Sequence, residues 1–338
     1  RDAAERGAQI LTRTRGTTAR REGAHWRIET EAQDGQRVVF HARALVNAAG
    51  PWAGEVIQAR IHVNSTERVR LVRGSHIVTR RLYDHDRCYF FQGSDGRIIF
   101  AIPYEQDFTL IGTTDQDHQG DPGNVVCSDT EKDYLCNFAS DYFAVPVTRD
   151  DIVWSYSGVR PLYDDGASSA TAATREYVLT LDAADGQAPL LNVFGGKITT
   201  YRRLAEGALA KLSSFFPDAS GAWTAGVALP GGDFPVDGVA ALQAGLLRDY
   251  PFLTEAWATR LIRTYGTEAR EVLGDAVTSS DLGRDFGATL TEAEIGWLMR
   301  KEFARTAEDV VWRRSKLGLH LSAEQIAAVE DHMEIGRA

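Results

Sequence analysis

The sequence predicts an α+β protein with three kinds of segment: an N-terminal part that mixes strands and helices, a central antiparallel β part, and an all-helical C-terminal part. Residues 25–42 alternate apolar and polar side chains on either side of Asp34-Gly35, which is a strong hairpin signal. Residues 68–182 contain repeated β-rich runs. After the linker-like LPGGDFP (residues 229–235), the pattern is almost entirely helical.

The composition is that of an ordinary globular protein. The 338 residues are 43% hydrophobic and 25% charged, and this length favours about two domains. The formal net charge of -10 argues against bulk binding of nucleic acid. Three cysteines form neither a CxxC pair nor a metal-ligand spacing, so we expect no metal site and a reducing compartment. No apolar run of about eighteen residues predicts a transmembrane helix.

The N-terminal residues suggest a chain that begins inside a domain. Residues 2–7 resemble the end of a helix that stops at a glycine, and residues 9–14 are expected to form a strand. We therefore expect a fragment that lacks an upstream portion. Further on, residues 44–46 predict a buried strand. Where this strand ends, the mostly small side chains of residues 47–50 (NAAG) leave space around the backbone. Pro51 suits a first helical turn.

The central part is expected to form an antiparallel sheet with one or two helices. The predicted strands are VRLVRGSHIVT (69–79), the hairpin YFFQGSDGRIIFAIP (89–103) around Asp95-Gly96, FTLIGTTD (108–115), DIVWSYSGVRPLY (151–163) and REYVLTLD (175–182), with a helix over 128–144. His76 lies in the first strand and is a candidate general base. The alternative is a core histidine whose hydrogen bonds are satisfied.

Two arginines are candidates for binding an anionic ligand. Arg160 stands between a valine and a proline in SGVRPL, and Arg175 stands at the mouth of the next strand. The rigid fork of arginine suits carboxylate or phosphate. The alternative is structural ion pairing of both arginines with Asp164, Asp165 or Glu176.

The stretch NVFGGKITTYRRLAEGALAKL (192–212) predicts a buried strand, a glycine elbow and an amphipathic helix. Gly195 and Gly196 allow the backbone to approach a ligand closely. The helix that begins near Thr199 directs unpaired N–H groups at that space, and Lys197 adds a full positive charge. The elbow therefore suits an electron-rich or anionic group. A plain β–α turn with a surface lysine is the alternative.

These motifs together resemble the FAD-dependent (respiratory, aerobic) glycerol-3-phosphate dehydrogenases. The matching stretches, in order, are LVNAAGPWA, RGSHIV, IGTTD, DIVWSYSGVRPL, ATREYVL, VFGGKITTYRRLAE, PFLTE, SDLGRDFG and DVVWRRSKLGL. The resemblance implies a Rossmann-type FAD domain, interrupted by an antiparallel substrate domain of the D-amino-acid-oxidase type and followed by a helical domain. On this basis the expected domains are 1–61 (part of the FAD domain), 62–189 (substrate domain), 190–216 (return to the FAD domain) and 217–338 (C-terminal helical domain).

The resemblance also implies an activity and a set of site residues. It implies oxidation of sn-glycerol 3-phosphate to dihydroxyacetone phosphate by hydride transfer to FAD, with electrons passed to ubiquinone. It implies a cytoplasmic protein held peripherally at the inner face of the cell membrane, with a homodimer as one form. Arg160 and His76 are the implied catalytic residues, and Arg175 and Lys197 the implied phosphate ligands. The implied FAD contacts are Asn47, Ala48, Ala49, Gly50 and Pro51 on one side and Gly195, Gly196, Lys197, Ile198, Thr199 and Thr200 on the other.

One departure and three alternatives accompany this resemblance. The family's GxGxxG motif does not occur in the sequence, so we expect the chain by itself to be inactive and to hold FAD poorly. A related flavin oxidase acting on an amine or hydroxy acid would need only one arginine for a carboxylate. A non-catalytic module would use the helical tail for docking or dimerisation.

The basic residues 312–316 are a candidate membrane contact, and a solvated helix face is the favoured alternative.

Overall fold

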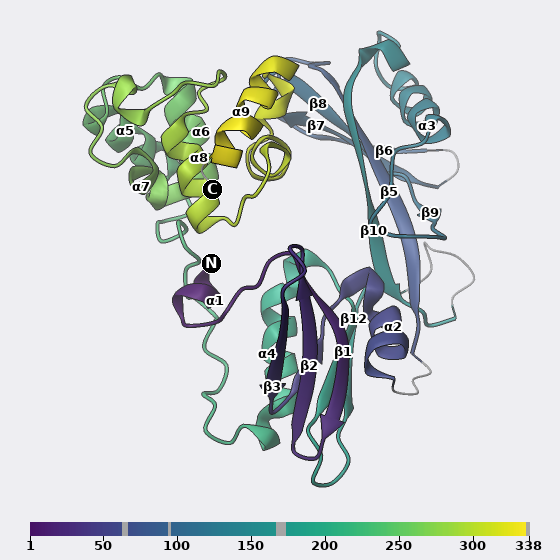
Figure 1. The fold of residues 1–338 in the computed structure, drawn as a ribbon. Helices are drawn as coiled ribbons and strands as arrows, with labels where there is room; N and C mark the ends of the chain where they lie inside the picture. The colour runs from purple at the N-terminus through teal and green to yellow at the C-terminus, as the bar shows by residue number, and fades with distance from the viewer. Residues whose placement is uncertain (63–66, 94–95, 167–173, 336–338) are drawn as a thin grey trace. The chain divides into compact units, whose positions relative to one another are not determined.

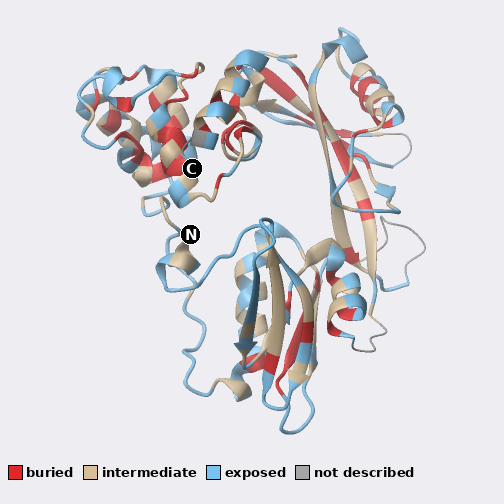
Figure 2. Cartoon of the chain, in the orientation of Figure 1, coloured by how far each residue is buried: buried red, intermediate tan, exposed pale blue. Residues whose placement is uncertain are grey.

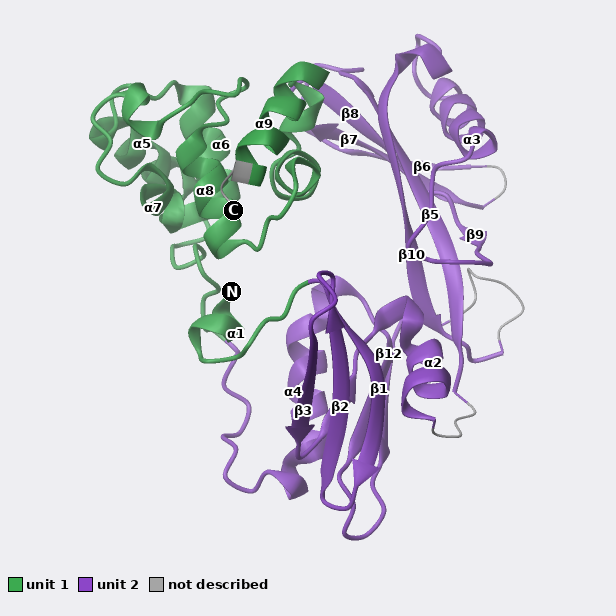
Figure 3. Cartoon of the chain, in the orientation of Figure 1, with its two compact units in different colours: residues 1–12, 226–338 green, residues 13–225 purple. Residues whose placement is uncertain are grey.

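The computed structural model describes residues 1–62, 67–93, 96–166 and 174–335 (Figure 1). The chain divides into two compact units, one formed by residues 13–225 and the other by residues 1–12 together with 226–338 (Figure 3). Among the described residues, no helix combines the length and the apolar character needed to cross a bilayer.

The larger unit begins with a small antiparallel sheet made of β1 (Thr14–Glu22), β2 (His25–Ala32) and β3 (Arg37–Ala42). Gly35 has a φ of +85° in the turn between β2 and β3, which confirms the predicted hairpin. The strand predicted over residues 9–14 is wrong, because β1 begins only at Thr14. Ile10 and Leu11 are 44% and 52% exposed, so their apolar character does not mark a buried strand.

A second sheet of three strands has the order β11-β12-β4 and consists of β4 (Leu45–Asn47), β11 (Tyr177–Asp182) and β12 (Leu190–Gly195). β12 pairs with β4 in parallel and with β11 in antiparallel fashion. The predicted boundary between residues 189 and 190 therefore falls inside this sheet. The reason is that β11 and β12 form one hairpin, paired from Tyr177 opposite Gly195 to Asp182 opposite Leu190.

Short helices flank the second sheet. They are η1 (Gly50–Trp52), α2 (Ala53–Glu55), η2 (Val56–Ile61), η4 (Ile198–Thr200), α4 (Tyr201–Leu212) and η5 (Ser213–Phe215). Pro51 lies in the first turn of η1, as its fixed φ predicted. The predicted strand–elbow–helix over residues 192–212 is also found, with the strand ending at Gly195 and the long helix beginning at Tyr201.

The third sheet is antiparallel and has the order β10-β5-β8-β7-β6, with β9 also pairing with β5. Its strands are β5 (Val69–Arg80), β6 (Tyr89–Gln92), β7 (Ile98–Tyr104), β8 (Phe108–Gly112), β9 (Gln116–Asp117) and β10 (Ile152–Tyr163). Each of these strands except β9, which follows the predicted run 108–115, agrees with a run predicted from the sequence. The predicted Asp95-Gly96 turn lies partly outside the described residues.

One face of this sheet packs against α3 (Asp129–Ser140), which follows a loop and precedes η3 (Arg149–Asp151). Ser128 caps α3, and Glu131 completes the capping box that begins the helix. Ile77, Ile111 and Leu135 have no exposed surface in the core between sheet and helix, whose buried residues can be followed in Figure 2. The opposite face of the sheet is not part of that core, and it carries the predicted catalytic residues.

The smaller unit is helical, as predicted for the C-terminal residues. Its elements are α1 (Asp2–Glu5), α5 (Val239–Asp249), α6 (Glu255–Tyr265), η6 (Gly266–Glu268), α7 (Ala269–Leu273), η7 (Ser279–Leu282), α8 (Glu292–Lys301), η8 (Asp309–Arg314), η9 (Leu317–Leu319) and α9 (Ala323–Ile335). Two of these helices have well-defined ends: Thr291 accepts a hydrogen bond from the Glu294 backbone at the start of α8, and α6 ends at Gly266 with a φ of +58°.

The first residues of the chain group with these helices and not with the expected FAD-domain part. The Arg1 guanidinium donates to both carboxylate oxygens of Glu268 at 2.5 Å and lies 4.9 Å from the centre of the Trp297 ring. A 3.4 Å ion pair to Glu302 adds to this anchor. These contacts explain why the division of the chain places residues 1–12 apart from the rest of the predicted segment 1–61.

The basic stretch 312–316 is engaged within its own unit. Arg313 pairs with Glu308 at 3.0 Å, and Arg314 donates to the Glu302 carbonyl at 2.7 Å. Lys316 donates to the Trp312 carbonyl. The basic side chains of the stretch are thus engaged by neighbours in the same unit, and only Arg313 of residues 312–316 is exposed, so the stretch is not the solvated helix face that was the favoured alternative.

Candidate active site

The register between β5 and β10 brings the predicted catalytic residues to one face of the third sheet. Three cross-strand pairs define this face: His76 with Tyr156, Gly74 with Gly158, and Val72 with Arg160. Successive side chains of a strand point to opposite faces, so these six residues share the face away from α3. His76 and Arg160, which are separated by more than eighty residues in the sequence, are therefore neighbours across a floor of two glycines.

His76 is tightly enclosed on this face. Its ring stacks on Tyr156 with centroids 5.0 Å apart and an interplanar angle of 7°. A Cβ added at Gly112, its partner on β8, would overlap the imidazole. Burial and the nearby charge of Arg160 lower the pKa of His76 to about 4. The imidazole is therefore neutral at physiological pH and able to accept a proton.

One nitrogen of the His76 ring is unusual. Nδ1 is buried and has no hydrogen-bond partner among the described residues. The predicted alternative of a satisfied core histidine does not fit this finding, because a buried imidazole nitrogen without a partner is costly. An unpaired buried atom of this kind requires an explanation, and a catalytic role of the ring is one such explanation.

Arg160 lies over Gly74. A Cβ at position 74 would stand 2.5 Å from both terminal nitrogens of the guanidinium, so the glycine leaves the space that the side chain fills. The guanidinium donates to Asp115 Oδ1 at 2.7 Å and to Thr113 Oγ1 at 3.1 Å. Arg160 is therefore in an ion pair, as the structural alternative predicted, but its partner is Asp115 and not Asp164 or Asp165. The Arg160 side chain remains 33% exposed and accessible to an anion.

The glycine elbow after β12 has the backbone form that the sequence predicted. Gly195 and Gly196 have φ values of +67° and +93°, which other residues rarely adopt. A Cβ at Gly195 would stand 2.9 Å from the carbonyl oxygen of Glu176. Beyond the elbow neither η4 nor α4 has a side-chain cap, and Ile198 is 86% exposed. The start of this helix is therefore open to a ligand.

Three positively charged side chains, those of Arg160, Arg175 and Lys197, flank the same part of the larger unit. Tyr177 pairs with Gly195, so Arg175 and Lys197, each two residues beyond that pair, lie at the same end of the β11–β12 hairpin. The elbow also approaches the end of β10, because a Cβ at Gly195 would lie 3.7 Å from the Pro161 carbonyl. Pro161 directly follows Arg160. Arg175 and Lys197 are exposed, and neither forms an ion pair with a described residue. The predicted pairing of Arg175 with Glu176 is absent among those residues.

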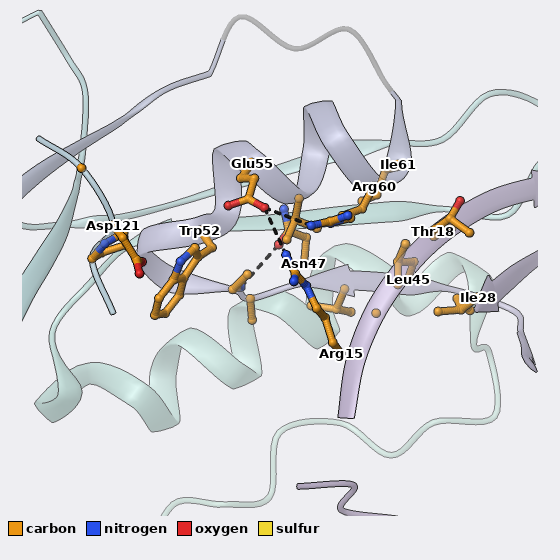
Figure 4. Close-up of a pocket in the computed structure, with 18 residues that line it drawn as sticks. Arg15, Thr18, Ile28, Leu45, Asn47, Trp52, Glu55, Arg60, Ile61 and Asp121 are labelled. Carbon is orange, nitrogen blue, oxygen red and sulfur yellow. Dashed lines mark hydrogen bonds and ion pairs between the residues drawn. The ribbon is translucent and has the colours of Figure 1, made fainter. Parts of the chain in front are cut away.

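A cavity of about 930 Å³ opens beside β4 (Figure 4). Its size suits a cofactor or drug-sized ligand. Of the predicted FAD contacts, Asn47, Ala48 and Ala49 line it, whereas Gly50 and Pro51 and the elbow residues do not. Asn47 is buried, and its amide nitrogen donates to the Ala53 carbonyl at 3.0 Å and to Asn192 Oδ1 at 3.1 Å. It therefore also joins β4 to β12.

The remaining wall of the cavity holds charged residues that the sequence did not single out. Glu55 stands between two arginines, with Arg60 at 3.3 Å and Arg15 at 3.7 Å. Trp52, which follows the predicted Pro51, lines the cavity and is 40% exposed. Across the described residues, no group of three or more His, Cys, Asp or Glu side chains is arranged to hold a metal ion.

Comparison with known proteins identifies the family. A family model described as FAD dependent oxidoreductase matches residues 1–202. The chain belongs to the FAD-dependent oxidoreductases. A second model, the C-terminal domain of alpha-glycerophosphate oxidase, matches residues 222–336 of this oxidoreductase.

Two curated relatives are similar over nearly the whole chain. The aerobic glycerol-3-phosphate dehydrogenase of Escherichia coli (strain K12) is 46% identical over 325 residues, which cover 96% of this chain and 65% of that protein. The D-erythritol 1-phosphate dehydrogenase of Brucella abortus (strain 2308) is 44% identical over 331 residues, 97% of this chain and 66% of that protein. The predicted resemblance is confirmed. The chain spans about two thirds of the length of these relatives.

A solved structure agrees with the fold. The glycerol-3-phosphate dehydrogenase from Bacillus halodurans, complexed with FAD, matches with a TM-score of 0.78 and 21% identity, over 99% of this chain and 70% of that chain. At this identity the match concerns the fold alone. The predicted fold class, with its oxidoreductase part and helical C-terminal part, is confirmed.

Sequence reasoning missed several residues of this FAD-dependent oxidoreductase. Tyr156 and Gly112 contact or shape the position of His76, and Asp115, Thr113 and Gly74 do the same for Arg160. A signal existed for all five, because each lies within a stretch that carried the family resemblance: Gly74 in RGSHIV, Gly112, Thr113 and Asp115 in IGTTD, and Tyr156 in DIVWSYSGVRPL. The strand register that joins them to Arg160 was not visible in the sequence.

Proposed function

We propose that the whole protein oxidises sn-glycerol 3-phosphate to dihydroxyacetone phosphate with FAD as the hydride acceptor. The observation that carries this proposal is the sheet face on which neutral His76, with its unpaired Nδ1, lies near Arg160 beside the bare backbone of Gly158. A proton acceptor and a cation next to an open floor suit the oxidation of a hydroxyl group on an anionic substrate.

The residues present fit FAD. Gly195 and Gly196 make a backbone cradle that a Cβ would fill, and the uncapped helix start beyond them is open. Asn47, Ala48 and Ala49 line a cavity large enough for part of a dinucleotide. Bound FAD would accept the hydride from the substrate carbon. The helix start and Lys197 place positive potential at the elbow, which favours a group that gains negative charge.

The chain's own side chains would divide the remaining work. Arg175 and Lys197 would pair with the phosphate dianion, since a buried dianion needs cationic partners. Arg160 would orient the substrate near its reacting carbon. His76 would take the hydroxyl proton.

The similarity to a D-erythritol 1-phosphate dehydrogenase supports a second candidate substrate. Erythritol phosphate also carries a hydroxyl group and a phosphate, and the two cations beyond the β11–β12 hairpin suit either molecule. A related amine or hydroxy-acid oxidase is less well supported, because a carboxylate needs one arginine and this unit offers two arginines and a lysine.

Four further parts of the proposal rest on the family resemblance. Electrons would pass to a ubiquinone-type acceptor, and the protein would associate peripherally with the inner face of the cell membrane from the cytoplasm. A homodimer is the proposed assembly. We also propose that the cofactor part draws on residues within 1–61 and 190–216 and the substrate part on residues within 62–189.

The decisive experiment records the flavin spectrum of the full-length gene product without oxygen, before and after adding sn-glycerol 3-phosphate. Bleaching of the oxidised flavin bands would support cofactor and substrate together. Bleaching only with erythritol phosphate would favour the second candidate. A bound flavin that ignores both phosphates but responds to an amine or hydroxy acid would support the oxidase alternative. A folded protein without flavin would overturn the proposal.

A further inference from the structure

We propose that Asp115, assisted by Thr113, is a positioning residue that holds the Arg160 guanidinium over Gly74 for the substrate. This inference rests on the proposed function, which assigns the substrate to Arg160. It adds that Arg160 is fixed by a segment outside its own strand. Without that segment the long side chain would sample several rotamers and lose its aim at the substrate.

The segment that carries Thr113 and Asp115 is held beside β5 by strand pairing at both of its ends. Before it, β8 pairs with β5 at Gly112 opposite His76. After it, β9 pairs with β5 at Gln116 opposite Arg73. Three residues, 113–115, therefore bridge a fixed gap alongside Gly74 and Ser75. Their backbone has little freedom, so the side chains they carry are well placed to act as an anchor.

A polar contact in the middle of the bridge reinforces this. The Ser75 backbone N–H donates to Thr114 Oγ1 at 2.9 Å, and Thr114 Oγ1 donates to Glu131 Oε1 at 2.8 Å. Thr114 and Glu131 are 1% and 4% exposed. Thr114 thus attaches the segment 113–115 to the core on the α3 side, while Thr113 and Asp115, on either side of it, contact Arg160 on the substrate side.

The hold on Arg160 leaves the guanidinium able to bind a ligand. Arginine has five N–H donors, and the contacts with Asp115 and Thr113 account for two of them within the described part of the chain. Asp115 and Arg160 are 28% and 33% exposed, so the pair is not sealed from solvent. A charge-assisted bond at 2.7 Å fixes one end of the fork, and the remaining donors stay available.

The glycine beneath the guanidinium is the second half of the arrangement. Gly74 is buried, and only the absence of a Cβ lets the guanidinium lie there. Asp115 holds the guanidinium through an ion pair, and the absence of a side chain at Gly74 leaves the space that the guanidinium occupies. The position of Arg160 is therefore determined by an attractive contact and by a vacant volume.

The test compares Asp115→Asn with Asp117→Asn in the full-length protein. Asp117 is a matched control, because it lies only two residues from Asp115 and pairs through two 2.8 Å bonds with Arg70 and not with Arg160. Thr113→Val is a second variant that removes the weaker contact. For each, kcat and KM are measured for sn-glycerol 3-phosphate. The reactivity of Arg160 toward phenylglyoxal is followed by peptide mass spectrometry.

We expect Asp115→Asn to lower kcat/KM by roughly 10- to 100-fold, as misplacement of a substrate-binding group does. Arg160 should react several-fold faster with phenylglyoxal, and protection by sn-glycerol 3-phosphate should need more ligand. Thr113→Val should show the same changes to a smaller extent, and Asp117→Asn should match the wild type in all three readouts.

Two failures are distinguishable. If Asp115→Asn and Thr113→Val leave both kcat/KM and Arg160 reactivity at the level of Asp117→Asn, the positioning role is overturned while the proposed function stands. If Asp115→Asn does not fold, Thr113→Val decides by the same readouts. A wild-type protein whose flavin is not reduced by sn-glycerol 3-phosphate, and whose Arg160 the phosphate does not protect, would overturn the proposed function together with this inference.

Discussion

Gly74 on β5 and Gly158 on β10 lie opposite each other on the same face of the sheet, yet only one of them has open space above it. A Cβ at Gly74 would meet the guanidinium of Arg160 at 2.5 Å, whereas a Cβ at Gly158 would meet nothing within 4 Å. The first glycine makes room for a side chain of the protein. The second leaves open space, and the pair therefore marks the limits of the proposed substrate floor.

Because Gly74 makes room for Arg160 and Gly158 faces open space, substitutions at the two glycines should reduce activity for different reasons. Gly74→Ala should displace the flexible end of Arg160, and Gly158→Leu should fill the floor. Both should change the free energy of unfolding by less than about 1 kcal/mol, because neither Cβ meets backbone. Gly158→Leu should raise KM at least about tenfold, and Gly74→Ala should lower kcat as well. Urea denaturation and steady-state kinetics check this. Equal KM in Gly158→Leu and wild type would place the substrate elsewhere.

His76 should act as a proton acceptor over a wide pH range. Its pKa of about 4, set by burial and by Arg160, keeps the imidazole neutral at every pH well above that value. The rate should therefore fall on the acid side only as the pH approaches 4. His76→Gln should reduce kcat by about 10² to 10⁴, the usual contribution of a general base. A pH–rate profile of both proteins tests this, and an unchanged kcat in His76→Gln would contradict it.

The same pKa predicts a pH dependence of stability. In the unfolded chain the pKa of His76 returns toward 6.5, so between pH 6.5 and pH 4 the unfolded state binds the proton and the folded state does not. The free energy of unfolding should therefore decrease as the pH falls through this window, by up to about 3 kcal/mol from this residue. Urea denaturation of wild type and His76→Gln at pH 7 and pH 4.5 isolates the effect. The variant should lose less stability than the wild type on acidification.

Glu131 should contribute strongly to stability. Burial raises the pKa of its carboxyl group, but hydrogen bonds from Ser128, Thr114 and Ser75 outweigh burial, and the net pKa lies below the ordinary value. Glu131→Gln should lower the free energy of unfolding by about 1.5–3 kcal/mol, because it removes a charged acceptor of several buried bonds. Asp129→Asn in the same helix is the control, since Asp129 is 72% exposed and should matter by less than about 0.5 kcal/mol. Similar losses in both variants would refute this assignment.

Lys197 should matter for the substrate and not for the fold. It is exposed at the elbow and forms no ion pair with a described residue. Lys197→Ala should raise KM for sn-glycerol 3-phosphate about tenfold or more, as expected for the loss of a charged partner of phosphate, and leave the melting temperature unchanged. Lys211→Ala, at an exposed position of the helix that follows, should behave as wild type in both measurements.

Local features of the fold were predictable where a local cause exists. Asp34-Gly35 predicted a hairpin because a tight turn needs the conformations that these residues adopt. The strand expected over residues 9–14 failed because propensity does not supply a partner strand, and Ile10 and Leu11 remain partly exposed. The predicted boundary between residues 189 and 190 separates two strands of one sheet for a related reason. The pairing of β11 with β12 depends on tertiary register, which one sequence does not reveal.

The residues of the candidate site were likewise predictable only where a local motif points to them. His76, Arg160 and the glycine elbow were found because each residue type in its motif has a chemical use. Asp115 was not found, because its ion pair with Arg160 requires β8, β5 and β10 to lie in one particular register. The charged wall of the cavity, formed by Arg15, Glu55 and Arg60, likewise joins residues that are distant in the sequence.

The β11–β12 hairpin has a consequence for engineering. Arg175 and Lys197 extend from its open end, whereas its turn, with Asp185-Gly186 exposed at the tip, lies at the opposite end of the ladder. The chain could therefore be cut at this tip, and new termini or an inserted tag could be placed there, without altering the spacing of the two cations. A circularly permuted protein opened at Asp185-Gly186 would keep the two proposed phosphate ligands at the opposite end of the hairpin from its new ends.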